Sequence, residues 1–210
     1  MKRKINLLIL LLAVWSCSNP GGSDKIPEDT TVSTPSLIPL AAGNTWTYTE
    51  EYISPDTNYV TEYTVRVTGT EQIGDEVWWK LETWRGDSVI TRTRYLIAQN
   101  DSIYELQYNW QTPVKSLQYF IPVDSVQRFN SLLGGDVGIA KTASILDTTI
   151  ITPQGNFSEC YMFEYSTPDW TTREILSPKV GIIVNWFIHH PSLGGIEYER
   201  IARIKSYVIK

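Results

Sequence analysis

The sequence VWWKLETWRGDSVITRTRYLIAQNDSIYEL, residues 77–106, decides the fold class of this 210-residue chain. Apolar and polar side chains alternate along it, which is typical of strands that bury one face. Two turn signals, Gly86-Asp87 and Asn100-Asp101, divide the stretch into three strands. It therefore predicts two consecutive antiparallel hairpins.

The register of these hairpins follows if one core face stays continuous. A two-residue turn at the first signal would place core-facing side chains beside two arginines, which costs several kcal/mol for each buried charge. A three-residue loop over 85–87 instead pairs Trp79 with Thr93. At the second signal, a two-residue loop keeps the same face by placing Ile97 opposite Tyr104.

The face opposite this predicted core carries aromatic and basic side chains together. Its candidate binding residues are Trp78, Trp84, Arg92 and Arg94. Tryptophan and arginine are enriched at interaction hot spots, which makes this face a candidate binding surface. The same pattern fits cross-strand cation–π packing, and the sequence leaves both interpretations open.

Strands of the same kind continue on both sides of the stretch. Trp46, Tyr48 and Tyr52 alternate with polar residues, and turn signals recur toward the C-terminus. We expect an all-β domain, an antiparallel meander of about nine or ten strands. It forms either a curved half-barrel or a closed barrel.

One segment interrupts the meander and predicts a short helix near 125–133. Asp124 can cap it, Gln127 lies three residues on as in a capping box, and Gly134 can end it. We expect this helix to lie across an open end of the sheet.

The N-terminus predicts export. Residues 1–16 combine a basic start with an apolar run that is shorter than the roughly 20 residues a spanning helix needs. The residues Val14-Trp15-Ser16-Cys17 resemble the lipobox of bacterial lipoproteins, although Trp15 is bulkier than the residue usual there. The resemblance implies cleavage before Cys17 and lipidation of that cysteine. Ordinary cleavage after Ser18, which would discard Cys17, is the alternative.

Two segments are expected after the signal. Residues 17–36, rich in proline and glycine, predict a flexible tether, and residues 37–210 a single β domain. We expect a lipid-anchored protein of the cell envelope, at the outer membrane, whose acyl chains make the membrane contact.

The charge of the mature chain excludes some partners. Loss of the three basic residues of the signal leaves 15 basic residues against 23 acidic ones, a net charge of −8. A surface of this sign disfavours nucleic acid, so we expect none as a partner.

The second cysteine has its own interpretation. Cys160 lies among aromatic residues, so we expect a buried thiol that packs as a small hydrophobic group. A disulfide to Cys17 is the alternative.

A search for catalytic and cofactor motifs finds none. Residues 135–142 come near to a phosphate-binding loop, but an alanine replaces the glycine that must precede Lys141. His189 and His190 are neighbours on a strand and point to opposite faces, so they cannot hold a metal together. We expect no catalytic residue, no metal site and no cofactor.

Two further segments carry a resemblance. The sequence IPLAAGNTWTY, residues 38–48, resembles the opening PLxxGNxWxY segment of many uncharacterised bacterial envelope lipoproteins. The sequence LSPKVGII, residues 176–183, is similar to their late PxVGI strand. The resemblance implies no activity. We expect Gly43 and Asn44 to turn the chain into the first strand and Trp46 to anchor that strand in the core.

These observations favour a non-enzymatic envelope protein whose concave aromatic face binds an apolar ligand or lipid. The alternative is an assembly partner of another envelope protein, bound through a strand edge or the aromatic and arginine face. An apolar cavity would favour the first function, and a filled interior with an exposed aromatic patch the second.

Overall fold

A computed structural model describes residues 36–109, 112–133, 137–191 and 195–210. Within these ranges the chain consists of strands, turns and loops, without a helix. The predicted signal peptide, Cys17 and all of the tether except Ser36 lie outside the described residues.

Fourteen strands follow one another in the described residues. They are β1 (Thr45–Ile53), β2 (Asn58–Ile73), β3 (Glu76–Arg85), β4 (Val89–Gln99), β5 (Ser102–Asn109), β6 (Thr112–Phe120), β7 (Val126–Leu133), β8 (Val137–Leu146), β9 (Ile150–Thr152), β10 (Gly155–Phe157), β11 (Cys160–Ser166), β12 (Trp170–Ser177), β13 (Gly181–His189) and β14 (Tyr198–Val208). The all-β prediction is confirmed, but its count of nine or ten strands is too low. One of the strands that this count leaves out is β7, which the sequence predicted as a helix.

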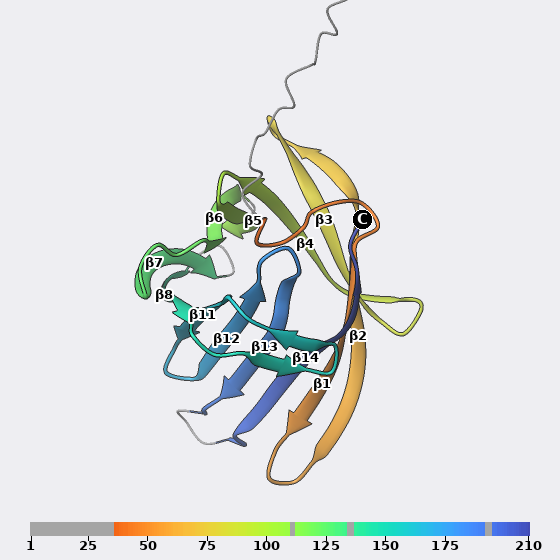
Figure 1. Cartoon of the computed structure of the whole chain (residues 1–210), viewed down its shortest axis with the longest axis vertical. Helices are drawn as coiled ribbons and strands as arrows, with labels where there is room; N and C mark the ends of the chain where they lie inside the picture. Colours follow the sequence, from red (N-terminus) through yellow and green to blue (C-terminus); the bar gives the residue numbers. More distant parts are fainter. Residues whose placement is uncertain (1–35, 110–111, 134–136, 192–194) are drawn as a thin grey trace, which may run out of the picture. The chain divides into compact units, whose positions relative to one another are not determined.

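Twelve strands form one antiparallel sheet in the order β6-β5-β4-β3-β2-β1-β14-β13-β12-β11-β8-β7. The sheet curls until its two edge strands, β6 and β7, approach each other (Figure 1). Side chains bridge this seam, because the Ser116 hydroxyl of β6 accepts a hydrogen bond from the Leu132 N–H of β7 at 2.8 Å. The domain is thus a nearly closed barrel rather than an open half-barrel.

The predicted helix over 125–133 is wrong, because this segment is strand β7. It pairs with β8 from Val126 opposite Ser144 onward. Phe129 packs against Phe120 with ring centroids 5.0 Å apart, and Arg128 on the other face is exposed. Gln127 accepts a hydrogen bond from the Val123 N–H at 3.0 Å. The residue expected to complete a helix cap therefore closes the turn before a strand.

The predicted pairing of Trp79 with Thr93 is also wrong. Trp79 lies opposite Leu96, and Leu81 lies opposite Arg94, with a register shift between Thr83 and Trp84. This register buries an arginine, which a carboxylate on the next strand neutralises, as described below. The prediction for the following turn is confirmed, because Ile97 lies opposite Tyr104.

Two side chains of β1 fasten that strand to the start of β13. The Trp46 indole donates to the Val180 carbonyl at 2.5 Å, and the Tyr48 hydroxyl donates to the Ile182 carbonyl at 2.8 Å. Both ring systems are buried, which confirms the predicted anchoring role of Trp46. Gly181, between the two acceptors, has a φ of 97°, a conformation that favours glycine.

Asn44 connects the beginning and the end of the domain. It is fully buried; its amide donates to the Pro39 carbonyl at 2.8 Å and accepts from the Lys210 N–H at 2.9 Å. Its own carbonyl accepts from the Val67 N–H of β2 at 2.9 Å. Gly43, with a φ of 89°, makes the turn before it, as the sequence predicts.

The prediction for Cys160 is confirmed. It is a free, fully buried cysteine in the apolar core, and burial raises the pKa of its thiol to about 11. A buried thiol of this kind packs as a small hydrophobic group.

Replacement of Trp46 tests the connection between β1 and β13. Trp46→Phe leaves the Val180 carbonyl without its donor, so we expect a loss of about 1–3 kcal/mol in the free energy of unfolding, measured with urea. Trp84→Phe is the matched control, because the indole N–H of Trp84 is buried without a partner among the described residues. Equal costs for the two variants would contradict the role assigned to Trp46.

Candidate functional site

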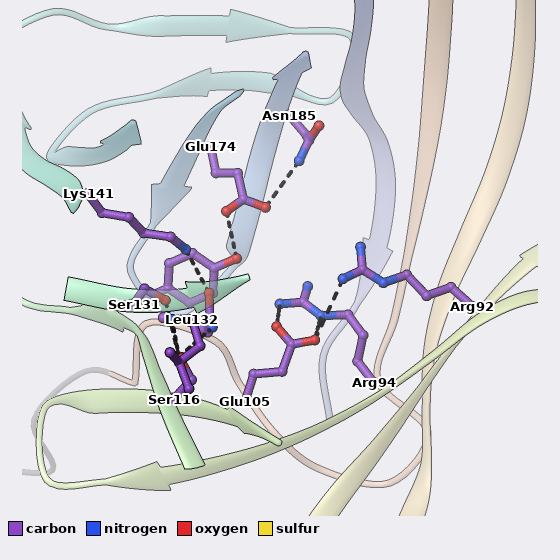
Figure 2. A network of polar contacts seen from close by, with 11 residues as sticks. Arg92, Arg94, Glu105, Ser116, Ser131, Leu132, Lys141, Glu174 and Asn185 are labelled. Atoms are coloured by element: carbon purple, nitrogen blue, oxygen red, sulfur yellow. Dashed lines mark hydrogen bonds and ion pairs between the residues drawn. The ribbon is translucent and has the colours of Figure 1, made fainter. Parts of the chain in front are cut away.

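The interior of the curled sheet is only partly filled. A cavity of about 340 Å³ lies among inward-facing side chains that extend from β1 around to β14. Tyr48 and Tyr119 line it and also belong to the apolar core, so the two regions meet at these rings. Figure 2 shows Lys141, Glu174, Glu105 and Arg94 extending from different strands toward this common space.

The lining carries more basic than acidic side chains. The basic residues are Arg85, Arg92, Arg94, Lys141 and Arg200. The acidic residues are Glu50, Glu105 and Glu174. The cavity therefore has an excess of two positive charges, inside a chain whose net charge is −5. This contrast favours an anion as the occupant.

Arg94 and Glu105 form the central ion pair. The Arg94 Nε and Nη2 atoms donate to the two carboxylate oxygens of Glu105, each at 2.8 Å, and Arg92 lies 3.6 Å from the same carboxylate (Figure 2). Burial opposes ionisation of Glu105, but the charge of Arg94 outweighs it and lowers the pKa of this carboxyl. Burial likewise opposes the Arg94 charge, but Glu105 raises the pKa of the guanidinium well above its ordinary value. Both groups are therefore charged at neutral pH.

Lys141 is a buried cation that forms no direct ion pair within the described residues. Lys141 is only 3 % exposed, and its ammonium donates a hydrogen bond to the Gln118 side-chain oxygen at 2.7 Å. The ammonium lies 4.9 Å from the ring centre of Tyr165. Burial lowers the pKa of its ammonium, and the charges of Glu174 and Glu105, which act without direct contact, only partly oppose this effect. The protein thus leaves a positive charge only partly compensated inside the sheet.

Glu174, another carboxylate of the cavity, already accepts hydrogen bonds from neutral side chains of the protein. Glu174 accepts a hydrogen bond from the Tyr119 hydroxyl at 2.8 Å and another from the Asn185 amide at 3.1 Å. Two other buried polar atoms of the lining, Nε of Arg200 and Oγ1 of Thr172, make no hydrogen bond of normal geometry within the described part of the chain. They remain available to a ligand.

An aromatic band continues from the cavity along the same concave face. Ring contacts of 4.8–6.0 Å join Tyr59, Tyr52, Tyr198, Phe187, Trp170 and Tyr165 in one series across β2, β1, β14, β13, β12 and β11. Phe187 and Tyr165 also line the cavity. The concave face therefore combines an apolar strip with a charged pocket, which suits an amphipathic molecule.

The four residues predicted as a binding surface do not share a face. Arg92 and Arg94 line the cavity, whereas Trp78 and Trp84 are absent from its lining. Trp78 is only 1 % exposed, with the Lys115 ammonium 5.9 Å from its ring. The guanidinium carbon of Arg66 lies 5.2 Å from the ring centre of Trp84. The tryptophans thus make cation–π contacts with basic residues other than the predicted arginines.

Sequence reasoning missed Glu105, Lys141, Glu174 and Arg200. Lys141 follows the alternation Ile139-Lys141-Ala143, in which all three residues are buried. A lysine at an inward-facing position between two apolar residues was the sequence signal that could have identified Lys141 as part of the site. The near match to a phosphate-binding loop at 135–142 pointed to Lys141 for the wrong reason, since it lies on strand β8.

Other classes of site are not found in the described residues. They contain no group of three or more histidine, cysteine, aspartate or glutamate side chains placed to hold a metal ion. They also contain no helix long and apolar enough to cross a membrane.

Comparisons with known proteins give two likenesses of fold. No protein-family model and no curated protein matches the chain. It is similar to a solved structure provisionally named as a lipoprotein of Parabacteroides distasonis ATCC 8503, with 13 % identity, a TM-score of 0.46, and coverage of 83 % of this chain and 99 % of that one. It is also similar to one provisionally named as an exported protein with a YmcC-like fold from Bacteroides fragilis NCTC 9343, with 11 % identity, a TM-score of 0.44, and coverage of 83 % and 100 %. At these values the likenesses assign neither a family nor a function.

A double-mutant cycle tests the ion pair in the cavity. Arg94→Met and Glu105→Gln each leave one buried group without its partner, so we expect each to cost about 3–5 kcal/mol in urea unfolding at pH 7. The double variant should cost less than the sum of the two, because the groups are coupled. Additive costs would contradict the pairing.

Acid provides the control for this cycle. The folded state lowers the pKa of Glu105 below its ordinary value of 4.5, chiefly through Arg94, with Arg92 and Lys141 also facing it. The coupling is therefore fully present above pH 4.5 and is lost as the pH falls through the lower folded-state pKa. A coupling that stayed constant down to strong acid would not come from this carboxylate.

Proposed function

We propose that this chain is a lipid-anchored protein of the bacterial cell envelope whose β domain binds a small amphipathic molecule in its interior, without chemical conversion. The unfilled cavity beside a continuous aromatic band is the observation that carries this proposal. Its volume of about 340 Å³ lies at the lower end of the range for small-molecule sites.

The cavity changes the kind of ligand expected. A purely apolar ligand or lipid would place hydrocarbon against Arg94, Glu105 and Lys141, whose charges need polar neighbours. A ligand with one polar end suits both parts of the interior. Its polar end can lie beside the charged side chains, and its apolar part can lie along the aromatic band.

The alternative, assembly with another envelope protein, has less support. The predicted aromatic and arginine face is divided between two sides of the sheet. The edge strands β6 and β7 face each other across the seam and are joined through Ser116. Neither feature offers the long free strand edge that strand addition uses.

Anchoring depends on Cys17, so its replacement tests localisation. We expect the native protein to fractionate with membranes and to carry acyl chains on Cys17 by mass spectrometry, and Cys17→Ala to be released. Cys160→Ala, which removes the buried core thiol, is the control and should stay with the membranes. A soluble native protein that begins at Asn19 would show ordinary cleavage after Ser18 instead.

Occupancy of the cavity tests the binding function. We expect native mass spectrometry of protein from its own membranes to show a bound small molecule that Thr83→Trp loses, since Thr83 lines the cavity. Thr93→Trp adds the same bulk at an exposed position outside the lining and should keep the molecule. An adduct that survives Thr83→Trp, or none in the native protein, would contradict the proposal.

A further inference from the structure

The residues around Thr172 form one row across the concave face. Successive register partners place Arg200 of β14 beside Phe187, Phe187 beside Thr172, Thr172 beside Tyr165, and Tyr165 beside Lys141 of β8. Thr172 is therefore the midpoint of the row, with one cation two strands away on each side. At about 4.8 Å between neighbouring strands, each backbone lies roughly 10 Å from that of Thr172.

Both cations lie over the rings that separate them from Thr172. The Arg200 guanidinium carbon lies 4.6 Å from the ring centre of Phe187, and the Lys141 ammonium lies 4.9 Å from the ring centre of Tyr165. Two long basic side chains thus approach Thr172 from opposite sides. Aromatic faces support such cations but do not neutralise them.

The polar atoms of this row have unused hydrogen-bonding capacity. Nε of Arg200 is buried without a partner in the described ranges. Oγ1 of Thr172 is close enough to the Tyr165 hydroxyl to affect its pKa, but it makes no hydrogen bond of normal geometry there. An ammonium has three donors, and within the described residues Lys141 uses one of them, in its hydrogen bond to Gln118. A buried donor without an acceptor destabilises the protein, so a ligand that supplies acceptor oxygens here binds more tightly than one that does not.

The protein's own acids in the cavity are engaged elsewhere. Glu105 pairs with Arg94, and Glu50 pairs with Arg85 at 2.6 Å. Glu174 lies on the same strand as Thr172 but accepts from Tyr119 and Asn185. These pairings leave Arg92, Lys141 and Arg200 against Glu174, which keeps the excess of two positive charges. Arg92 lies beside the Glu105 carboxylate, so Lys141 and Arg200 are the two basic side chains of the lining that form no ion pair in the described residues.

From this arrangement we infer that the ligand is an amphipathic anion whose acidic group lies over Thr172 between Lys141 and Arg200. The inference rests on the proposed binding function and names its ligand class. A carboxylate, a sulfate or a phosphate monoester supplies the acceptor oxygens, and a short hydrocarbon chain extends along the aromatic band from Phe187.

Isothermal titration with matched eight-carbon probes tests the inference. Octanoate, octyl sulfate and octyl phosphate present the three acidic groups, whereas 1-octanol and octyltrimethylammonium present the same chain without a negative charge. We expect at least one anion to bind in a one-to-one ratio, about tenfold or more tightly than octanol, and the cation not to bind. The preferred anion identifies the acidic group.

Three variants locate the site. Lys141→Met, Arg200→Met and Thr172→Val should each weaken anion binding, the first two by about tenfold or more. Thr172→Val keeps the shape of a buried residue, so it tests the site even if a charge variant fails to fold. Lys115→Met, at a lysine outside the lining, is the control and should leave binding unchanged.

The outcomes separate this inference from the proposed function. Octanol that binds as tightly as the anions, with no effect of the three variants, would overturn the anion site and leave the binding function standing. Failure of every probe to bind would overturn both the anion site and the proposed binding of a small amphipathic molecule. Anion binding that survives all three variants would place the acidic group elsewhere and overturn the inference.

Discussion

The two hydrogen bonds between Arg94 and Glu105 are the interaction on which the interior of this sheet depends. They allow a register in which an arginine lies opposite Leu81, on the face that also forms the apolar core. Without Glu105, that register would bury an unpaired charge at a cost of several kcal/mol. Because the pair is made, β3, β4 and β5 can turn charged side chains inward and keep part of the interior polar.

The interior of the sheet has an apolar part and a charged part, and the boundary between them lies where apolar side chains stop along β1 and β14. Trp46 and Tyr48 fix β1 to the start of β13, and the core gathers around them. Beyond Tyr48 the inward positions of β1 and β14 are Glu50 and Arg200, so the same curled sheet changes from a packed core to a charged cavity. The segments 38–48 and 176–183, which resemble envelope lipoproteins, meet at this junction.

Local patterns predicted much of this fold. Alternation identified the strands, the residues 100–101 set one hairpin register, and the surroundings of Cys160 indicated a buried thiol. The register of the preceding hairpin was missed because it depends on a bulge and on a carboxylate in another strand. Segment 126–133 suited a helix locally, yet pairing with β8 made it a strand. The charged lining of the cavity was missed because Lys141 and Arg200 face a common interior only after the sheet has formed and curled.

A crystal structure of the full protein with saturating octanoate measures the central claim most directly, namely that the cavity is a site for an acidic group. The account predicts density for a carboxylate over Thr172, within hydrogen-bonding distance of its Oγ1 and of Arg200 Nε or Lys141 Nζ. A cavity filled by rearranged protein side chains, with Arg200 Nε and Thr172 Oγ1 bonded to protein groups and octanoate absent, would contradict it.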